Sequence, residues 1–298
     1  MSRTVCLIVN PVAGGGRAAR VLPSVERALD GHGVTARTEM TRDLEHARHL
    51  ASDAVAAGET VVTLSGDGLV GTVADELRGH PRAVMGILPG GRGNDLARLL
   101  GIPVDPVAAC AVVADGVERE IDLGEVNGRA FISIASAGFD SDVNRIANEA
   151  PAWLGRAVYS YGILRALGDW RPTTMRLDAD PPAPRREYTV YSVAAANSST
   201  YGGGMRLAPE ARLDDGLLDV VIIEAMPRWR LLVRAWRVFN GTHGRFAEVH
   251  MFKARTVSIT ADRPFTAYAD GDPIADLPVE IRALPAALRV LVPATAAA

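Results

Sequence analysis

Short apolar runs alternate with amphipathic segments along the first part of the chain. The runs are rich in β-branched and aliphatic residues and end at glycine, proline or polar turns, as buried strands do. Strands are predicted at 4–10, 34–40, 60–64 and 83–88. Helices are predicted around 21–29, near 43–57, around 73–77 and at 95–100. This alternation predicts an α/β domain with a mostly parallel sheet and helices on both faces.

After about residue 121 the pattern changes to short β-like runs separated by glycine, proline and aspartate. Such runs are typical of an antiparallel sandwich or barrel. They occur at 131–139, 173–180, 187–197, 217–223, 256–261 and 265–271. Helices are predicted near 151–168 and 228–240, and the last run, 288–293, predicts a strand that could return to either sheet.

The chain has 298 residues, which favours two domains with separate cores. The change of pattern places an α/β domain at 1–123 and a β-rich domain at 124–285. The strand near 286–298 is left open to return to the first domain.

Charge and cysteine content exclude some classes of protein. A net charge of −3 and a pI near 6.1 argue against a nucleic-acid partner, because phosphate contacts demand a basic face. Cys6 and Cys110 have neither metal-site spacing nor a disulfide pattern. The apolar runs are too short for a signal peptide or a membrane span. We therefore predict a cytoplasmic protein that contacts membranes at most transiently.

Polar and glycine-rich turns follow each predicted strand of the first domain. The carboxyl ends of parallel strands meet at one edge of a sheet, where ligands bind. Helix N-termini beside these glycines could bind phosphate. The turns contain Asn10 with glycines 14–16, Thr41, "SGDG" at 65–68 and "PGGRGND" at 89–95.

Asp67 and Asp95 lie in two of these turns and would repel a phosphate unless a cation joined them. Mg²⁺ commonly links one or two carboxylates to nucleotide phosphates. A nucleotide–magnesium site is therefore one hypothesis. The alternatives are a tight turn at Asp67 and a helix-capping carboxylate at Asp95.

A dinucleotide-binding fold is a further alternative. Gly14-x-Gly16-x-x-Ala19 follows a strand and opens a helix, and Glu39 stands where a ribose-binding acid would. That hypothesis leaves "SGDG" and "GGRGND" without a role. No Walker A pattern occurs in the sequence.

Taken together, the motifs resemble the diacylglycerol kinase catalytic family, which includes sphingosine, ceramide and bacterial lipid kinases. The resemblance spans nearly the whole chain in the family's order. It rests on "VNPVAGGG" at 9–16, "SGDGLVGTVADEL" at 65–77, "LPGGRGNDLARLLGIP" at 88–103, "IDLGEVN" at 121–127, "ASAGFDSDV" at 135–143, "YGGGMRLAPEARLDDGLLDVVII" at 201–223 and "YADGDP" at 268–273.

The resemblance implies an ATP-binding α/β domain, a β-sandwich domain that holds the lipid, and a cleft between them. It implies that Asp270 is the general base and that Asp122 joins the Mg²⁺ network with Asp67 and Asp95. A second, structural metal site is implied at Asp214 and Asp215. The implied nucleotide pocket contains Asn10, Gly66, Asp67, Gly68, Gly91 and Asn94.

Several residues depart from the family pattern. Leu69, Gly71 and Thr72 stand in the "GGDGT..NE" region without its glutamate, and Asp272 replaces the glutamate of "DGE". Arg92 replaces a common threonine. The lysine usual in the first glycine loop is absent, which leaves Arg17 as a cation for the phosphates.

The predicted helix at 228–240 carries arginines 230, 234 and 237 on one face and Leu232, Trp236 and Phe239 on another. This pattern fits a helix lying on an anionic membrane surface. It equally fits a helix whose apolar face packs on its own sheet while the arginines face water, and we favour this second interpretation.

The predicted function is an ATP- and Mg²⁺-dependent lipid kinase of phospholipid metabolism that phosphorylates a diacylglycerol-like or sphingoid-like hydroxyl. Its partner is a lipid at a membrane surface, and a homodimer is left open. The alternatives are an NAD kinase-like enzyme, which has a similar "GGDG" turn, and a catalytically silent lipid-binding protein, which residues 69, 72, 92 and 272 suggest.

Overall fold

The chain, described here by a computed structural model, divides into two compact units. Unit 1 consists of Met1–Leu123 and Pro285–Ala298, and unit 2 of Gly124–Leu284. The structure describes residues 3–296 except 140, 144–145, 147–160, 163–164, 167, 169, 185 and 203. The chain passes between the units in two long strands, β5 (Val117–Val126) and β15 (Val279–Val292).

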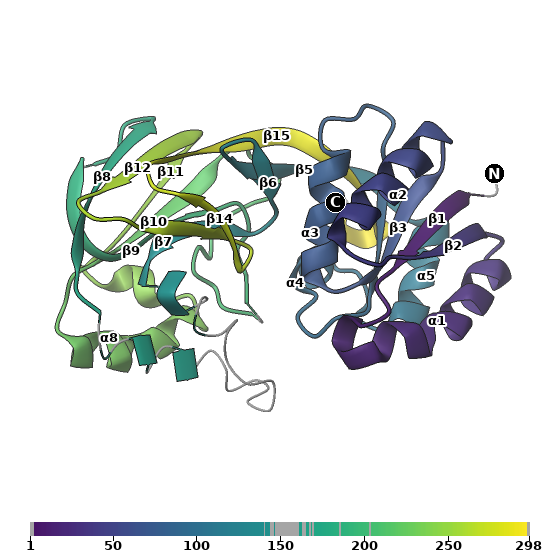
Figure 1. Cartoon of the computed structure of the whole chain (residues 1–298), viewed down its shortest axis with the longest axis horizontal. Coiled ribbons are helices and arrows are strands. Elements are labelled where there is room, and N and C mark those ends of the chain that lie inside the picture. The colour runs from purple at the N-terminus through teal and green to yellow at the C-terminus, as the bar shows by residue number, and fades with distance from the viewer. Residues whose placement is uncertain are drawn as a thin grey trace. The chain divides into compact units, whose positions relative to one another are not determined.

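Strands and helices alternate along unit 1, as predicted (Figure 1). The described elements are β1 (Thr4–Val9), α1 (Ala13–Gly31), β2 (Thr35–Met40), α2 (Leu44–Ala56), β3 (Thr60–Ser65), α3 (Asp67–Leu77), β4 (Met85–Pro89), α4 (Asp95–Leu99) and α5 (Pro106–Asp115).

The strands of unit 1 lie in the order β4-β3-β1-β2, and each neighbouring pair is parallel. Helix α1 packs against α5, and α2 packs against α3, so the two pairs cover opposite faces of the sheet (Figure 1). β1 and β3 are almost wholly buried, which explains their continuous apolar sequences. Along the sheet, β2 is the neighbour of β1 on one side and β3 is its neighbour on the other. The strand order therefore reverses direction between β1 and β3, and this is the topological switch point.

Unit 2 is an antiparallel β-sandwich. Its strand order is β14-β13-β7-β9-β8-β12-β15, and β10 pairs with β9 and β11. The described strands are β6 (Arg129–Phe131), β7 (Ile134–Gly138), β8 (Thr173–Asp180), β9 (Glu187–Ala196), β10 (Leu218–Glu224), β11 (Val249–Ala254), β12 (Thr256–Ala261), β13 (Thr266–Ala269) and β14 (Asp272–Asp276). Helical segments are α8 (Arg228–Ala235), η2 (Trp236–Val238) and η3 (His243–Arg245), and η4 (Ala294–Ala296) follows β15 in unit 1.

The core of unit 2 follows from alternation along its strands. On β8, Met175 and Leu177 are buried while Arg176 and Asp178 are exposed, because successive side chains point to opposite faces of a sheet. The buried side chains pack with residues of β10 and β12 such as Val220.

The predicted fold class is confirmed, with one refinement and one gap. The last strand was predicted to return to either sheet, and it takes part in both units. β15 pairs with β12 of unit 2 through Ile281 and with β4 of unit 1 through Val290. The helix predicted at 151–168 lies mostly outside the described residues. Among the described residues, no helix is long and apolar enough to cross a membrane.

Candidate active site

The glycine-rich turns of unit 1 follow strands that are neighbours in the sheet. β1 leads to Asn10, β3 leads to Gly66, and β4 leads to Gly90. These turns therefore share the carboxyl edge of the sheet, and two of them flank the switch point.

The first glycine loop is a left-handed turn at the start of α1. Gly14, Gly15 and Gly16 have φ of 61°, 68° and 81°, a region that only glycine adopts readily in succession. A Cβ added to Gly14 would lie 2.4 Å from the carbonyl oxygen of Gly90. The Asn10 side chain supports the loop by accepting a hydrogen bond from the Val12 amide at 3.2 Å. Glycine here permits both the turn and the approach of the third loop.

The second and third loops touch through their backbones. A Cβ added to Gly91 would lie 2.4 Å from the Cα of Gly66. The amides of Gly90 and Gly91 both donate to the Ser65 carbonyl, at 2.7 and 3.1 Å. The predicted convergence of the three glycine loops is therefore present in the structure.

Asp67 joins the second loop to the N-terminus of α4. Its Oδ2 accepts a hydrogen bond from the Asn94 amide, and its Oδ1 accepts one from the Asp95 amide, both at 2.8 Å. Gly93 is needed beside it, since a Cβ there would lie 2.7 Å from Oδ2. Asn94 is buried, has φ of 54°, and exchanges two hydrogen bonds with the Gly91 backbone. The Asp67 carboxylate is thus held in one orientation.

Two carboxylates lie together at this point. Desolvation by the surrounding protein raises the pKa of Asp67 above its usual value, and the negative charge of Asp95 raises this pKa further. The backbone hydrogen bonds oppose both effects. Ionising Asp67 is therefore costly unless a cation is bound nearby.

The Asp67 and Asp95 pair suits a hard divalent cation that keeps several waters. The two Asp67 oxygens accept hydrogen bonds from backbone amides, and a carboxylate has about four acceptor positions in all. Within the described residues, no group of three or more His, Cys, Asp and Glu side chains could form a metal site by itself. A cation here would therefore need ligands from water or from a phosphate.

Of the other predicted nucleotide-binding residues, Arg17 and Arg92 are exposed, and Thr41 is not. No described ion pair involves either arginine, so each could meet a phosphate. Thr41 is buried and its hydroxyl donates to the Asp43 carbonyl at 2.5 Å, which fixes a local turn. Gly68 is exposed within the first turn of α3.

Asp122 lies on β5 and is buried. Its Oδ1 accepts a hydrogen bond from the Ala286 amide at 2.8 Å. Ala286 has φ of 49°, so β15 is locally distorted where it meets this carboxylate. This contact gives Asp122 a structural role within unit 1, and its predicted role in the Mg²⁺ network stays a prediction.

Asp270 follows β13 in unit 2 and has φ of 50°. Its carboxylate accepts hydrogen bonds from three successive backbone amides between β6 and β7. Ile132 donates to Oδ2 at 2.7 Å, while Ser133 and Ile134 donate to Oδ1 at 2.8 and 3.1 Å. The residue is exposed despite these bonds. Asp270 is therefore a rigidly oriented and solvent-accessible carboxylate.

Asp214 and Asp215 are paired with basic side chains in the structure, and the structural metal at these residues stays a prediction. Asp215 Oδ2 lies 2.7 Å from the Lys253 ammonium, which also lies 3.0 Å from Asp219 Oδ2. Asp214 Oδ1 pairs with Arg212 at 3.0 Å. Two cations of the protein, Arg212 and Lys253, therefore share this cluster of three carboxylates.

Lys253 is the only lysine in the sequence. Burial would lower its pKa, but the hydrogen bonds with Asp215 and Asp219 raise this pKa overall, so the ammonium stays charged. Sequence reasoning missed this residue because it lies 38 positions from Asp215. The pairing of β10 with β11, which places Asp219 opposite Lys253, could have indicated it.

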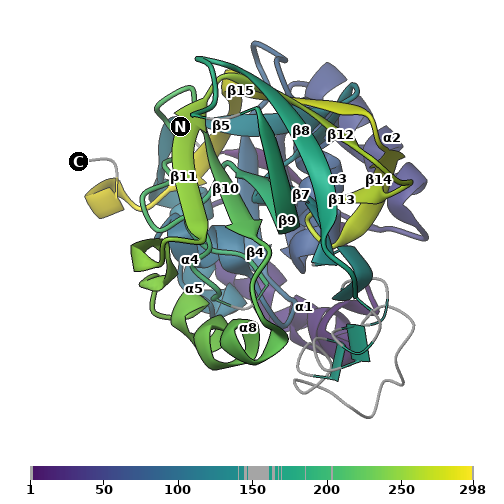
Figure 2. The ribbon, with the colours of Figure 1, turned by 90° about the vertical axis from the view of Figure 1, so that its left-hand side faces the viewer.

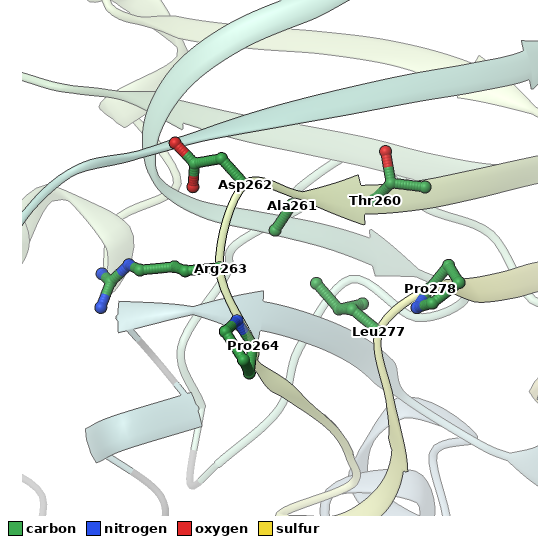
Figure 3. Close-up of a pocket in the computed structure, with 7 residues that line it drawn as sticks. All are labelled: Thr260, Ala261, Asp262, Arg263, Pro264, Leu277 and Pro278. Carbon is green, nitrogen blue, oxygen red and sulfur yellow. The ribbon is translucent and has the colours of Figure 1, made fainter.

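A separate open pocket lies on unit 2 and has a volume of about 500 Å³ (Figure 3). It is formed by the turn after β12 and the connection from β14 to β15. Its lining residues are Thr260, Ala261, Asp262, Arg263, Pro264, Leu277 and Pro278. None of the predicted site residues lines this pocket.

Comparisons with known proteins agree with these features. The diacylglycerol kinase catalytic domain matches residues 4–126, and the YegS C-terminal NAD kinase beta sandwich-like domain matches residues 133–292. A putative diacylglycerol kinase from Bacillus anthracis has a similar fold, with a TM-score of 0.81, 20% identity and 98% of each chain covered.

Two curated relatives match over almost their full length. A diacylglycerol kinase from Mycobacterium tuberculosis is 37% identical over 299 residues, covering 97% of this chain and 95% of the relative. A probable lipid kinase YegS-like protein from Pseudomonas aeruginosa is 34% identical over 295 residues. The match covers 97% of this chain and 94% of the relative. The chain therefore belongs to the family of diacylglycerol kinases and YegS-like lipid kinases.

Proposed function

We propose that the protein is an ATP-dependent lipid kinase that transfers the γ-phosphate to the hydroxyl of a diacylglycerol-like or sphingoid-like lipid. The single observation that carries this proposal is the meeting of three glycine loops beside the Asp67 and Asp95 carboxylates. Family membership supports the same reaction class, a phosphotransferase with an alcohol acceptor.

In this proposal unit 1 binds ATP at the carboxyl edge of its sheet. Backbone amides of the first glycine loop, at the start of α1, favour negative charge. Arg17 and Arg92 would add side-chain cations, and Asn10 and Asn94 hold the loops in shape. Gly66 and Gly91 let the second and third loops touch, and Gly68 is exposed at the start of α3.

Mg²⁺ fits the carboxylates of unit 1. Asp67 and Asp95 would hold it, with Asp122 as the third predicted acid, and the ion would neutralise charge on the phosphates when bound. The raised pKa of Asp67 supports this assignment, because a nearby cation would relieve its repulsion with Asp95.

Asp270 would accept or orient the proton of the lipid hydroxyl. Phosphoryl transfer depends on alignment more than on a strong base, so a carboxylate can perform this step. The three amides from 132–134 hold the carboxylate in one orientation, which removes the need to order it during the reaction. The hydroxyl oxygen would bond to the γ-phosphorus while the bond from that phosphorus to the β–γ bridging oxygen breaks, which releases ADP, and the hydroxyl proton would pass to Asp270.

The lipid substrate lies in a membrane, so we propose that the enzyme works in the cytoplasm and meets the bilayer transiently. Its product would enter phospholipid metabolism. A homodimer is compatible with this scheme, and the chemistry does not depend on it.

The test is incubation with radiolabelled ATP, Mg²⁺ and mixed lipid extracts, with NAD in a parallel reaction. We expect label in the organic phase and none on NAD. Label on NAD would support the NAD kinase alternative. If no lipid is labelled by the wild-type protein, the kinase proposal fails and a silent lipid-binding protein becomes the better account.

A further inference from the structure

Helix α8 and η2 expose a continuous apolar stripe at the end of unit 2. Figure 2 shows α8 beside the ends of the sandwich strands. The stripe recurs at intervals of three or four residues, which places its members on one face of a helix. It consists of Trp229 (64% exposed), Leu232 (43%), Val233 (62%), Trp236 (51%) and Phe239 (56%), and we call it the α8 apolar face.

The opposite side of the same helix holds it to unit 2. Leu231 packs against the cluster around Trp170 and Tyr191. Arg230 and Arg234 turn toward Glu248, at 3.1 and 2.7 Å. The interpretation favoured from the sequence is therefore wrong, since the apolar face points to solvent while two arginines bind the protein.

Such an arrangement needs a reason, because exposed tryptophan and phenylalanine gathered on one face normally mark an interaction site. The helix does not need the α8 apolar face for its attachment, which Leu231 and Glu248 already provide. The exposed stripe therefore suits a partner outside the chain.

Charge identifies the kind of partner. The segment 228–245 contains five arginines, whereas the whole chain has a net charge of −3. Arg230 and Arg234 are paired with Glu248, but Arg237 and Arg245 are exposed and no described ion pair involves them. The Arg237 guanidinium lies 4.4 Å from the centre of the Trp236 ring, so positive charge borders the apolar stripe directly. An anionic surface with an apolar interior matches both features.

We propose that the α8 apolar face, together with Arg237 and Arg245, is the surface by which this protein docks on an anionic lipid bilayer. The proposal rests on the proposed lipid kinase function, and it names the element that meets the membrane. Tryptophan and arginine favour the boundary between headgroups and acyl chains, because each combines apolar area with a polar end. A second copy of the chain fits less well, since a symmetric contact would bring like charges together.

The test measures binding of the full-length protein to vesicles in the absence of ATP. Co-sedimentation with phosphatidylglycerol–phosphatidylcholine vesicles is compared with pure phosphatidylcholine vesicles at low and high salt. We expect binding to the anionic vesicles that weakens with salt. The double variant Trp229→Ser/Trp236→Ser should bind about tenfold more weakly. Arg237→Gln should bind about fivefold more weakly.

Two exposed apolar residues of unit 1 provide the matched control. Val104→Ser/Val117→Ser also removes two exposed apolar side chains, 41% and 36% accessible, and should bind vesicles as wild type does. Circular dichroism and thermal melting verify that each variant is folded.

Three results would overturn the docking proposal. These are failure of wild type to bind anionic vesicles, equal binding by the tryptophan double variant, and a wild-type dimer that this variant converts to monomer. Failure of the kinase proposal is distinguishable, because it would leave vesicle binding intact while no lipid is phosphorylated. If both proposals hold, the tryptophan variant loses activity on vesicles but keeps its kcat on a water-soluble short-chain substrate.

Discussion

Asp67 of unit 1 and Asp270 of unit 2 are anchored in the same way but have different surroundings. Each follows a strand, and each carboxylate accepts hydrogen bonds from backbone amides of a distant segment. Asp67 lies near a second carboxylate, which contributes to its raised pKa. Asp270 receives three amides, and both aspartates are exposed. Backbone amides therefore orient both carboxylates, although Asp67 is suited to binding a cation and Asp270 to accepting a proton from a substrate hydroxyl.

The acidic cluster of unit 2 extends this contrast. Asp215 and Asp219 share one cation that belongs to the chain, Lys253. Desolvation nevertheless raises the pKa of Asp219, and the negative charge of Asp215 adds to this rise. Asp67 has no ion-pair partner among the described residues, and its repulsion with Asp95 invites a cation from solution. Acidic residues in the two units therefore have different expected responses to metal removal.

The largest expected effect is that of Asp67→Asn. The substitution keeps the size of the side chain but removes the charge that would bind the cation. We expect the rate of lipid phosphorylation to fall about a thousandfold, or about 4 kcal/mol in transition-state stabilisation. Asp30→Asn, on the exposed end of α1, is the control and should keep wild-type activity. A loss smaller than about tenfold would contradict the role given to Asp67.

Asp270→Asn should have a smaller effect, because positioning contributes more than base strength to phosphoryl transfer. We expect kcat to fall about a hundredfold while the KM for ATP stays the same. Asp276→Asn at the end of β14 is the control within unit 2. Steady-state kinetics with a lipid substrate decides the matter, and an unchanged kcat would remove Asp270 from the mechanism.

Lys253→Met tests the internal cation of unit 2. The substitution leaves Asp215 and Asp219 close together without their shared ammonium. The free energy of unfolding should therefore fall by about 1–2 kcal/mol. The loss is moderate because all three side chains are partly exposed to solvent. Added Ca²⁺ or Mg²⁺ should raise the melting temperature of this variant, whereas a chelator should leave that of wild type unchanged. Lys253→Arg keeps the charge and should lose less stability. A wild-type protein destabilised by the chelator would instead support a structural metal at this cluster.

The smallest expected effect is a difference in carboxyl titration. Carbon NMR of the nucleotide-free protein should show Asp67 titrating above the usual aspartate value of about 3.9. In Asp95→Asn its pKa should fall, because the like charge is gone. Asp262 of unit 2 is the internal comparison, since hydrogen bonds from the Thr173 hydroxyl and the Thr174 amide lower its pKa.

The directions of these two pKa shifts determine how folding stability depends on pH. The folded protein holds the Asp67 proton more tightly than the unfolded chain does, so this group's contribution to stability is lost as pH rises through the raised pKa. Asp262 behaves oppositely, and its contribution is lost as pH falls through its lowered pKa. If Asp67 titrates at or below the usual value, desolvation and the charge of Asp95 do not outweigh its backbone hydrogen bonds, and the predicted shift is wrong.

Local patterns predicted much of unit 1. The apolar run at 60–64 followed by "SGDG" indicated a strand, a turn and a helix, and β3 and α3 confirm it. Parallel strands put their carboxyl ends at one edge, so the meeting of the glycine loops followed from the order of elements alone. The helix α5 was not predicted, because its alanine-rich, uniformly apolar sequence has little amphipathic pattern.

Contacts between distant segments were not predictable in the same way. Periodicity reports which face of an element is apolar, but it does not report which backbone amides a carboxylate will meet. Asp270 and its donors are 136–138 residues apart, and Asp122 and Ala286 are 164 apart. The orientation of α8 was misjudged for a related reason, because an amphipathic pattern does not tell whether the apolar face packs or stays exposed.

Equilibrium binding of ATP tests the central contrast most directly. Calorimetric titrations of ATP, with and without Mg²⁺, would compare wild type, Asp67→Asn and Asp270→Asn. We expect Mg²⁺ to strengthen ATP binding by wild type and by Asp270→Asn equally, and to have little effect on Asp67→Asn. Mg²⁺-dependent binding that survives in Asp67→Asn, or that is lost in Asp270→Asn, would contradict the division of roles between the two carboxylates.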